Sequence, residues 1–194
     1  PTDINHGSNK TIVEEYCDTC SYNRRKAIGM FSDGSYVIVM RVGTIRLALL
    51  FYNSSHHLVN THKTGIKNDG EQVFNPYVIV FSDDSFVIAW NSAHQQDTSA
   101  SNYDVYMSIF NKDGRKTLAE TLVNTETELS QQFDGYGSKN IVVFSDDTFV
   151  IVYENTDNSD NQDHNGVAFQ ILNKDGTKKG TEVRDVEGLL TYSS

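Results

Sequence analysis

The chain contains one short segment three times. Residues 30–40 read MFSDGSYVIVM, residues 80–90 read VFSDDSFVIAW and residues 143–153 read VFSDDTFVIVY. Each copy places a Ser-Asp turn between two apolar runs, which is the pattern of a tight β-hairpin, because Asp and Gly accept the positive φ that such turns need. Internal repetition of this kind indicates a repeat architecture. We therefore expect three like units.

A second strand-and-turn segment recurs after the first. Residues 103–114 read YDVYMSIFNKDG and residues 166–176 read GVAFQILNKDG, whereas residues 45–54 read IRLALLFYNS and lack the Asp-Gly. Each unit therefore predicts four strands in an antiparallel meander, and those of the third unit fall at about 140–144, 148–154, 167–173 and 177–186. The repeats span about 26–60, 75–124 and 139–186, within a single domain of residues 1–194.

Hydrophobic patterning indicates which strands are inside. The second strand of the third unit is apolar at successive positions, 149–153, so both of its faces should be covered. The fourth strands, 117–123 and 177–183, are more polar, and we expect burial to fall from the first two strands outward to the fourth. No segment shows sustained helical periodicity. The sequence predicts an all-β, β-propeller-like fold.

Three units are fewer than the 4–8 blades that propellers typically use. A tight three-bladed ring, a three-sheet prism, an open arc and completion by another chain all remain open. The flanking segments 11–16 and 188–192 are strand-like enough to add to a sheet.

The repeat resembles bacterial extracellular repeats whose consensus runs Gln, Pro, an apolar strand, Asp-Gly-Gly-Phe-Val-Val-Ala-Trp and a strand ending in Asp-Gly. The matching residues here are Gln72, Pro76, 83–90 and 113–114. The resemblance implies propeller blades of large surface or secreted proteins, and no catalytic motif. Asp84 and Asp147 depart from it, because the consensus has Gly there, and so do Met40 and Tyr153, where it has Trp.

Charge and hydropathy limit the partners. The chain has 26 acidic and 16 basic residues, a formal net charge of −10, which disfavours nucleic acid because phosphate binding needs a basic surface. No apolar run approaches the roughly 20 residues of a membrane-spanning helix, so we expect no membrane insertion. The chain begins with Pro1, and we expect a processed product or a fragment, compatible with an extracellular or cell-surface location.

Covalent modification is predicted at four residues. Cys17 and Cys20 form a single CxxC without the further ligands of a zinc site, and we expect a local disulfide, with free thiols or a minor metal role as alternatives. Asn9 and Asn53 begin N-glycosylation sequons, which would be used if the protein is eukaryotic and secreted.

The loops between the second and third strands, 91–102 and 154–165, are the candidate binding surface. Asn161, Asp163 and Asn165 have the spacing of a calcium loop, but Leu172 stands where the final Glu would be, so a solvated acidic loop is the alternative that we favour. Candidate ligand contacts are His94 and His164, in these loops, and Tyr103 and Tyr136, which are flanked by polar loop residues.

Two other polar groups have simpler interpretations. The Ser-Asp turns at 32–34, 82–84 and 145–147 could line one rim with carboxylates, but we favour side chains that bond their own backbone. His56, His57 and His62 lack a recognised metal spacing and fit a polar outer strand.

No catalytic motif is present: neither a Gly-x-Ser-x-Gly elbow, nor a phosphate-binding glycine loop, nor a His-Glu-x-x-His pair. We expect no enzymatic activity and no cofactor. The first hypothesis is a structural protein that associates with copies of itself, into a filament if contacts are head-to-tail, through strand edges and terminal segments. The alternative is a lectin-like module that binds glycans through its loops.

Overall fold

The computed structural model describes residues 26–42, 46–63, 72–93, 103–125, 130–133, 140–157 and 164–184. All regular elements in this part are β-strands, arranged in three antiparallel sheets. Sheet 1 has the order β1 (Lys26–Met30), β2 (Tyr36–Val42), β3 (Arg46–Tyr52) and β4 (Leu58–Lys63). Sheet 2 has β5 (Val73–Val80), β6 (Phe86–Ala93), β7 (Tyr103–Phe110) and β8 (Lys116–Leu122). Sheet 3 has β10 (Ile141–Val143), β11 (Phe149–Asp157), β12 (His164–Leu172) and β13 (Val183–Arg184), and β9 (Ser130–Gln132) also pairs with β11.

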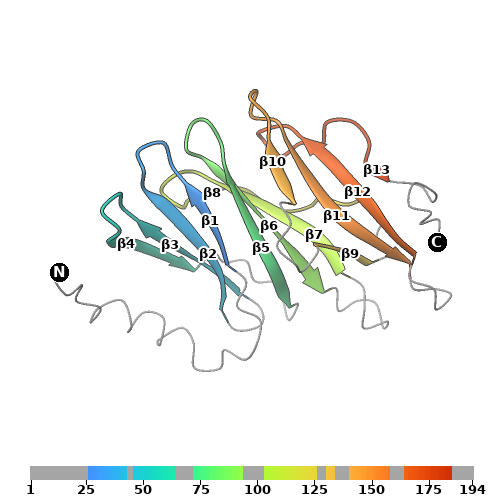
Figure 1. The fold of residues 1–194 in the computed structure, drawn as a ribbon, viewed down its shortest axis with the longest axis horizontal. Coiled ribbons are helices and arrows are strands. Elements are labelled where there is room, and N and C mark those ends of the chain that lie inside the picture. Colours follow the sequence, from blue (N-terminus) through green and yellow to red (C-terminus); the bar gives the residue numbers. More distant parts are fainter. Residues whose placement is uncertain are drawn as a thin grey trace, which may run out of the picture.

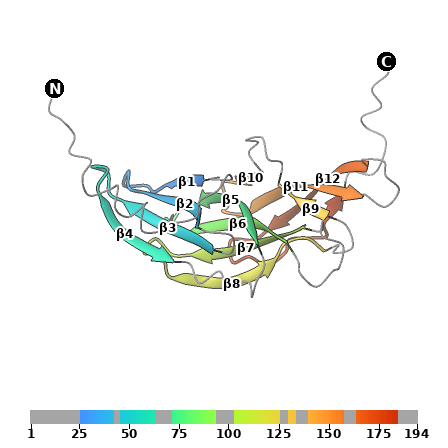
Figure 2. The same ribbon diagram turned by 90° about the horizontal axis from the view of Figure 1, so that it is seen from below.

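The sheets lie side by side in chain order along the long axis of the molecule (Figures 1 and 2). The first strand of sheet 2, β5, contacts the first strands of both neighbours, β1 and β10. The row of sheets is open rather than closed into a ring (Figure 1). Within the described residues, no helix is present that is long and apolar enough to cross a membrane.

An aromatic core joins sheets 1 and 2. Phe86 lies at its centre, with its ring 5.9 Å from that of Phe31, 6.2 Å from Phe51 and 5.4 Å from Phe110. Trp90 belongs to the same cluster and has no exposed surface. Burial of large aromatic side chains contributes most of the hydrophobic stabilisation at such an interface.

A second core joins sheets 2 and 3. Sheet 2 contributes Val87, Ala89 and Met107, and sheet 3 contributes Phe149 and Ile151, all fully buried. Among the described residues, only the middle sheet is therefore covered on both faces, and β6 is buried at 86–92. The expectation that the second strand of the third unit is covered on both faces is wrong, because sheet 3 has a neighbouring sheet on one side only among the described residues, and Val150 and Val152 are half-buried.

The repeated Ser-Asp segment forms the same turn in each sheet. The N–H of Phe31 donates to the carbonyl of Ser35, and the N–H of Gly34 donates to the carbonyl of Phe31. The equivalent bonds recur at 81–85 and 144–148. Gly34, Asp84 and Asp147 hold the left-handed position, with φ of 80°, 65° and 60°. Asp adopts this conformation more readily than most residues, so the chain reverses without glycine in two of the three sheets.

The strand predictions for the third unit hold for three of the four strands. β10, β11 and β12 match, although β11 and β12 extend further into the predicted loop. The fourth strand, predicted at 177–186, is reduced to β13 and an isolated bridge between Leu172 and Lys178. The predicted decline of burial from the first strand is also wrong, because β1 and β10 are partly exposed edge strands, whereas β6 and β7 are the most buried. The flanking segments 11–16 and 188–192 lie outside the described residues.

The short strand β9 was not anticipated. It pairs with the end of β11 at 154–156 and lies against β7, so it links sheets 2 and 3. Buried amides hold it: Gln131 donates to Asn155 Oδ1 at 2.9 Å, and the N–H of Phe133 donates to Asn91 Oδ1 at 3.0 Å. These bonds satisfy polar groups that burial would otherwise leave unpaired.

Candidate functional site

The turns between the first and second strands of the three sheets lie at one edge of the row (Figure 1). In each turn the first aspartate bonds its own hairpin. Asp33 accepts from the N–H and hydroxyl of Ser35, Asp83 does so from Ser85, and Asp146 from Thr148. The prediction that Asp and Ser bond their own backbone is confirmed for this position.

The second aspartate bonds the preceding sheet instead. Asp84 of sheet 2 accepts from the N–H of Ser32 at 2.7 Å and from its hydroxyl at 2.8 Å. Lys112, in the β7–β8 hairpin, places Nζ 2.8 Å from Oδ2 of both Asp33 and Asp84, and 5.4 Å from the centre of the Phe31 ring. Ser32, Asp33, Asp84 and Lys112 together form what we call junction 1.

Junction 2 repeats this arrangement between sheets 2 and 3. Asp147 accepts from the N–H of Ser82 at 2.9 Å and from its hydroxyl at 2.6 Å. Lys174, in the β12–β13 connection, lies 2.9 Å from Asp83 Oδ2 and 2.8 Å from Asp147 Oδ2. The prediction that the turns only reverse the chain is therefore wrong for the second aspartate, which joins neighbouring sheets.

The junction charges are stabilised by one another. The pKa of Asp147 is lowered to about 2, first by the Lys174 ammonium of its own sheet and then by the hydroxyl and N–H of Ser82 on sheet 2. Lys112 lowers the pKa of both Asp33 and Asp84, and the two carboxylates raise the pKa of the lysine. Charge-assisted hydrogen bonds of this type are stronger than neutral ones.

Asp147 therefore links stability to pH. Its pKa of about 2 in the folded state is below the ordinary value of about 3.9, so its contribution is present above about pH 4 and is lost as pH falls toward 2. Asp147→Asn keeps an acceptor and tolerates positive φ, and we expect a loss of about 1 kcal/mol at pH 7 and a flatter pH dependence between about pH 4 and 2. Urea denaturation at several pH values measures both.

Asp175→Asn is the matched control. It removes the same charge from sheet 3, but within the described part of the chain the Asp175 side chain bonds Thr177 of its own hairpin and no other sheet. A stability loss in the control as large as in Asp147→Asn would show that the inter-sheet contact contributes nothing specific.

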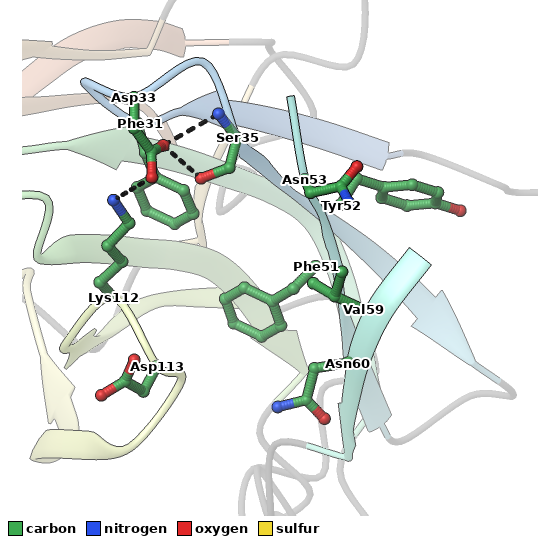
Figure 3. Close-up of a pocket in the computed structure, with 10 residues that line it drawn as sticks. All are labelled: Phe31, Asp33, Ser35, Phe51, Tyr52, Asn53, Val59, Asn60, Lys112 and Asp113. Atoms are coloured by element: carbon green, nitrogen blue, oxygen red, sulfur yellow. Dashed lines mark hydrogen bonds and ion pairs between the residues drawn. The ribbon is translucent and has the colours of Figure 1, made fainter. Parts of the chain in front are cut away.

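A pocket of about 320 Å³ opens beside junction 1 (Figure 3). The β1–β2 turn, β3, β4 and the β7–β8 hairpin form its walls, and its lining combines aromatic, aliphatic and polar side chains: Phe31, Asp33, Ser35, Phe51, Tyr52, Asn53, Val59, Asn60, Lys112 and Asp113. Figure 3 shows Lys112 reaching Asp33 across one side of this pocket. The pocket lies at the hairpin end of sheets 1 and 2, whereas residues 94–102 and 158–163 of the loops favoured for binding lie outside the described residues.

The structure shows the positions of several residues that the sequence predicted as site residues. Tyr103 is half-buried and packs edge-on against Phe74, with ring centres 5.5 Å apart. Asn165 belongs to β12 and pairs with Thr156, so it occupies a strand rather than a calcium-loop conformation. His164 is the first residue of the same strand. The other predicted residues lie outside the described part: Asn9, Cys17, Cys20, His94, Tyr136, Asn161 and Asp163.

The remaining candidates serve the β3–β4 hairpin. Asn53 Oδ1 accepts from the N–H of Ser55 and of His57, so this sequon lies in a turn. His56 holds the left-handed position of that turn, with φ 64°, and His62 on β4 packs edge-on against Phe51. Among the residues described, no group of three or more His, Cys, Asp or Glu side chains is placed to hold a metal ion.

Sequence reasoning missed the junctions, although a signal was present. The second and third units have both Asp in the turn, at 84 and 147, and Lys in an Asn-Lys-Asp-Gly hairpin, at 112 and 174. The first unit has Gly34 and Ser54 at these positions. The acidic and basic residues therefore occur together or not at all, as expected of contact partners.

Neither protein-family models nor curated proteins match this chain. Among solved structures, polysaccharide lyase Uly1 matches with a TM-score of 0.54 at 9% sequence identity, over 82% of this chain and 40% of that one. At this identity the likeness shows the fold alone. The chain spans less than half the length of that structure.

Proposed function

We propose that the chain is a structural, non-catalytic module that associates with copies of itself by stacking β-sheets face to face, in a propeller-like manner. One observation carries the proposal: both ends of the row expose large apolar side chains. On sheet 1 these are Ile28 and Met30, exposed by 60% and 67%, and on sheet 3 they include Val142, Phe144 and Val167, each exposed by about 45%. Contiguous exposed apolar surface marks interaction sites in soluble proteins.

The two end faces differ, so the contact between copies is head-to-tail. Such a contact gives a ring if the rotation closes and a filament if it does not. Two copies, each with three sheets, would supply six, within the 4–8 of typical propellers. The terminal segments that the sequence suggested for association lie outside the described residues. The end faces, in contrast, consist of described residues and offer a surface for the same contact.

The resemblance to extracellular repeats supports a secreted or cell-surface location, with glycans at Asn9 and Asn53. The intact mass of the native protein would detect these glycans.

Phe144→Asp tests the proposal. A charge on the apolar sheet 3 face should weaken association at least about tenfold, because burying a carboxylate against the apolar face of another copy is costly. Sedimentation equilibrium of the wild-type chain and the variant measures this. Val59→Asp is the control, since Val59 is 61% exposed but lines the pocket between sheets 1 and 2. A wild-type chain that stays monomeric at micromolar concentration would contradict the proposal.

Carbohydrate binding is the second candidate. It is supported by the pocket beside junction 1, which offers the hydroxyl, amide and charged groups that hydrogen-bond sugars, and by the likeness in fold to a polysaccharide lyase. Asn60 is exposed on β4 and lines this pocket, so Asn60→Ala should weaken any oligosaccharide binding seen by glycan array or calorimetry. A silent array would remove this candidate.

A further inference from the structure

The outer face of sheet 3 matches the faces that are covered elsewhere in the chain. Phe31 and Phe81 stand at equivalent positions in sheets 1 and 2 and are 4% and 3% exposed, because the next sheet covers them. Phe144 takes the same position in sheet 3 and is 46% exposed. The difference arises from the missing neighbour and not from the residue type.

The apolar character of this face extends over all four strands of the meander. Val142 on β10, Val167 on β12 and Val183 on β13 are 45–46% exposed, and the residues between them, Val150, Val152, Phe169 and Ile171, are half-buried. The equivalent face of sheet 2 is the one that packs against sheet 3, through residues that include Val87, Ala89, Val105, Met107 and Ile109. Sheet 3 thus presents the same kind of surface to a further sheet.

The turn at the edge of this face carries half of a junction. Ser145 and Asp146 correspond to Ser32 and Asp33 of junction 1 and to the same pair in junction 2. Asp146 Oδ1 accepts from Thr148, as its equivalents do from their own turns. Its Oδ2 lies 3.8 Å from Lys179 Nζ, a long contact between two side chains that are 61% and 53% exposed. In junctions 1 and 2 the equivalent oxygen is 2.8–2.9 Å from the lysine of the next sheet.

We propose that this face binds a β-sheet of defined chemistry: one with Asp in the left-handed position of its first hairpin and Lys after Asn in its second. The partner aspartate would accept from the N–H and hydroxyl of Ser145, and the partner lysine would join that aspartate to Asp146. Shape and charge complementarity follow directly from the two junctions inside the chain. The inference rests on the proposed stacking function and specifies its partner.

Sheet 1 of another copy supplies an apolar face but neither junction residue. Its positions hold Gly34 and Ser54, while the aspartates and lysines of sheets 2 and 3 are already engaged within the chain. A second copy would therefore bind this face through apolar contacts alone, and a sheet that also carries the Asp–Lys pair would bind it more tightly.

The double variant Gly34→Asp/Ser54→Lys tests this directly, because it installs the missing pair on sheet 1. Gly34 has φ +80°, a conformation that Asp84 and Asp147 adopt, and an added Cβ meets only Ser54 Cβ at 3.5 Å, an ordinary contact. We expect copies of the double variant to associate at least about tenfold more tightly than wild-type copies in sedimentation equilibrium. Circular dichroism confirms that each variant is folded.

Ser145→Ala/Asp146→Asn in the double-variant background is the control, and it should abolish the gain. A folded double variant that associates no more tightly than wild type would overturn the inference, as would a gain that survives the control. The proposed self-association has its own contradicting outcome. If the wild-type chain is monomeric and the double variant associates, self-association of the wild-type chain is contradicted and the junction inference is supported. Tight wild-type association that is insensitive to both changes supports stacking alone and overturns the junction as its determinant.

Discussion

Replacing Phe86 with alanine is expected to lower the free energy of unfolding by about 3–5 kcal/mol. Phe86 has no exposed surface, and its ring contacts aromatic rings from both sheets, those of Phe31 and Phe51 on one side and that of Phe110 on its own. Truncation would remove this burial and leave a cavity between sheets 1 and 2, since rings held by several β-strands cannot collapse inward to fill it.

Tyr36→Ala is the matched control for Phe86→Ala. Tyr36 holds the equivalent position in sheet 1, but it is half-buried; its ring stacks on that of its cross-strand neighbour Tyr52, at 5.0 Å, and the His56 ring lies tilted against it at 5.9 Å. A loss of about 1 kcal/mol is expected there. Urea denaturation followed by fluorescence measures both, because Trp90 is the only tryptophan and lies in the core that the first variant opens. Equal losses in the two variants would contradict the assignment of the core.

The local hairpins were predictable from the sequence because their causes are local. A Ser-Asp turn between apolar runs fixes two adjacent strands, and Asn-Lys-Asp-Gly fixes two more, so strands such as β7 and β12 fell within a few residues of the expected ranges. The predictions that failed concern burial, which depends on the neighbouring sheets. Val150 and Val87 are equivalent valines on equivalent strands, yet only Val87 is fully buried, because only sheet 2 has a sheet on each side.

The junctions show the same limit at the candidate site. The consensus of the extracellular repeats has Gly at the position of Asp84. The sequence alone shows this difference but not the physical reason for it. The reason is the 2.7 Å contact with Ser32, across 52 residues of chain, which exists only once the sheets have stacked in this register. Likewise, β9 is positioned by its pairing with β11 and by hydrogen bonds to side-chain amides of neighbouring strands. A three-residue strand has too short a pattern for the sequence to indicate these partners.

Replacing Gly114 with alanine is the second change with a large expected effect, a loss of about 2–4 kcal/mol. Gly114 has φ +83°, which costs alanine about 1–2 kcal/mol. A Cβ there would also lie 2.8 Å from Phe51 Cζ and 3.0 Å from its Cε2, and overpacking of this kind typically costs about 1–3 kcal/mol. The Phe51 ring cannot move aside easily, because Phe31, Phe86 and His62 surround it.

Close approach of the sheets, and not φ alone, is what requires glycine at this position. The equivalent residue of sheet 1 is His56, which keeps φ 64° in an exposed turn. Gly180→Ala separates the two costs, since Gly180 has φ +80° and nothing within 4 Å of an added Cβ, so only the conformational loss of about 1–2 kcal/mol should appear. Chemical denaturation of both variants measures the difference, which is the cost of forcing sheet 2 away from sheet 1. If Gly114→Ala and Gly180→Ala lose the same stability, the β7–β8 hairpin does not pack against Phe51 as the structure places it.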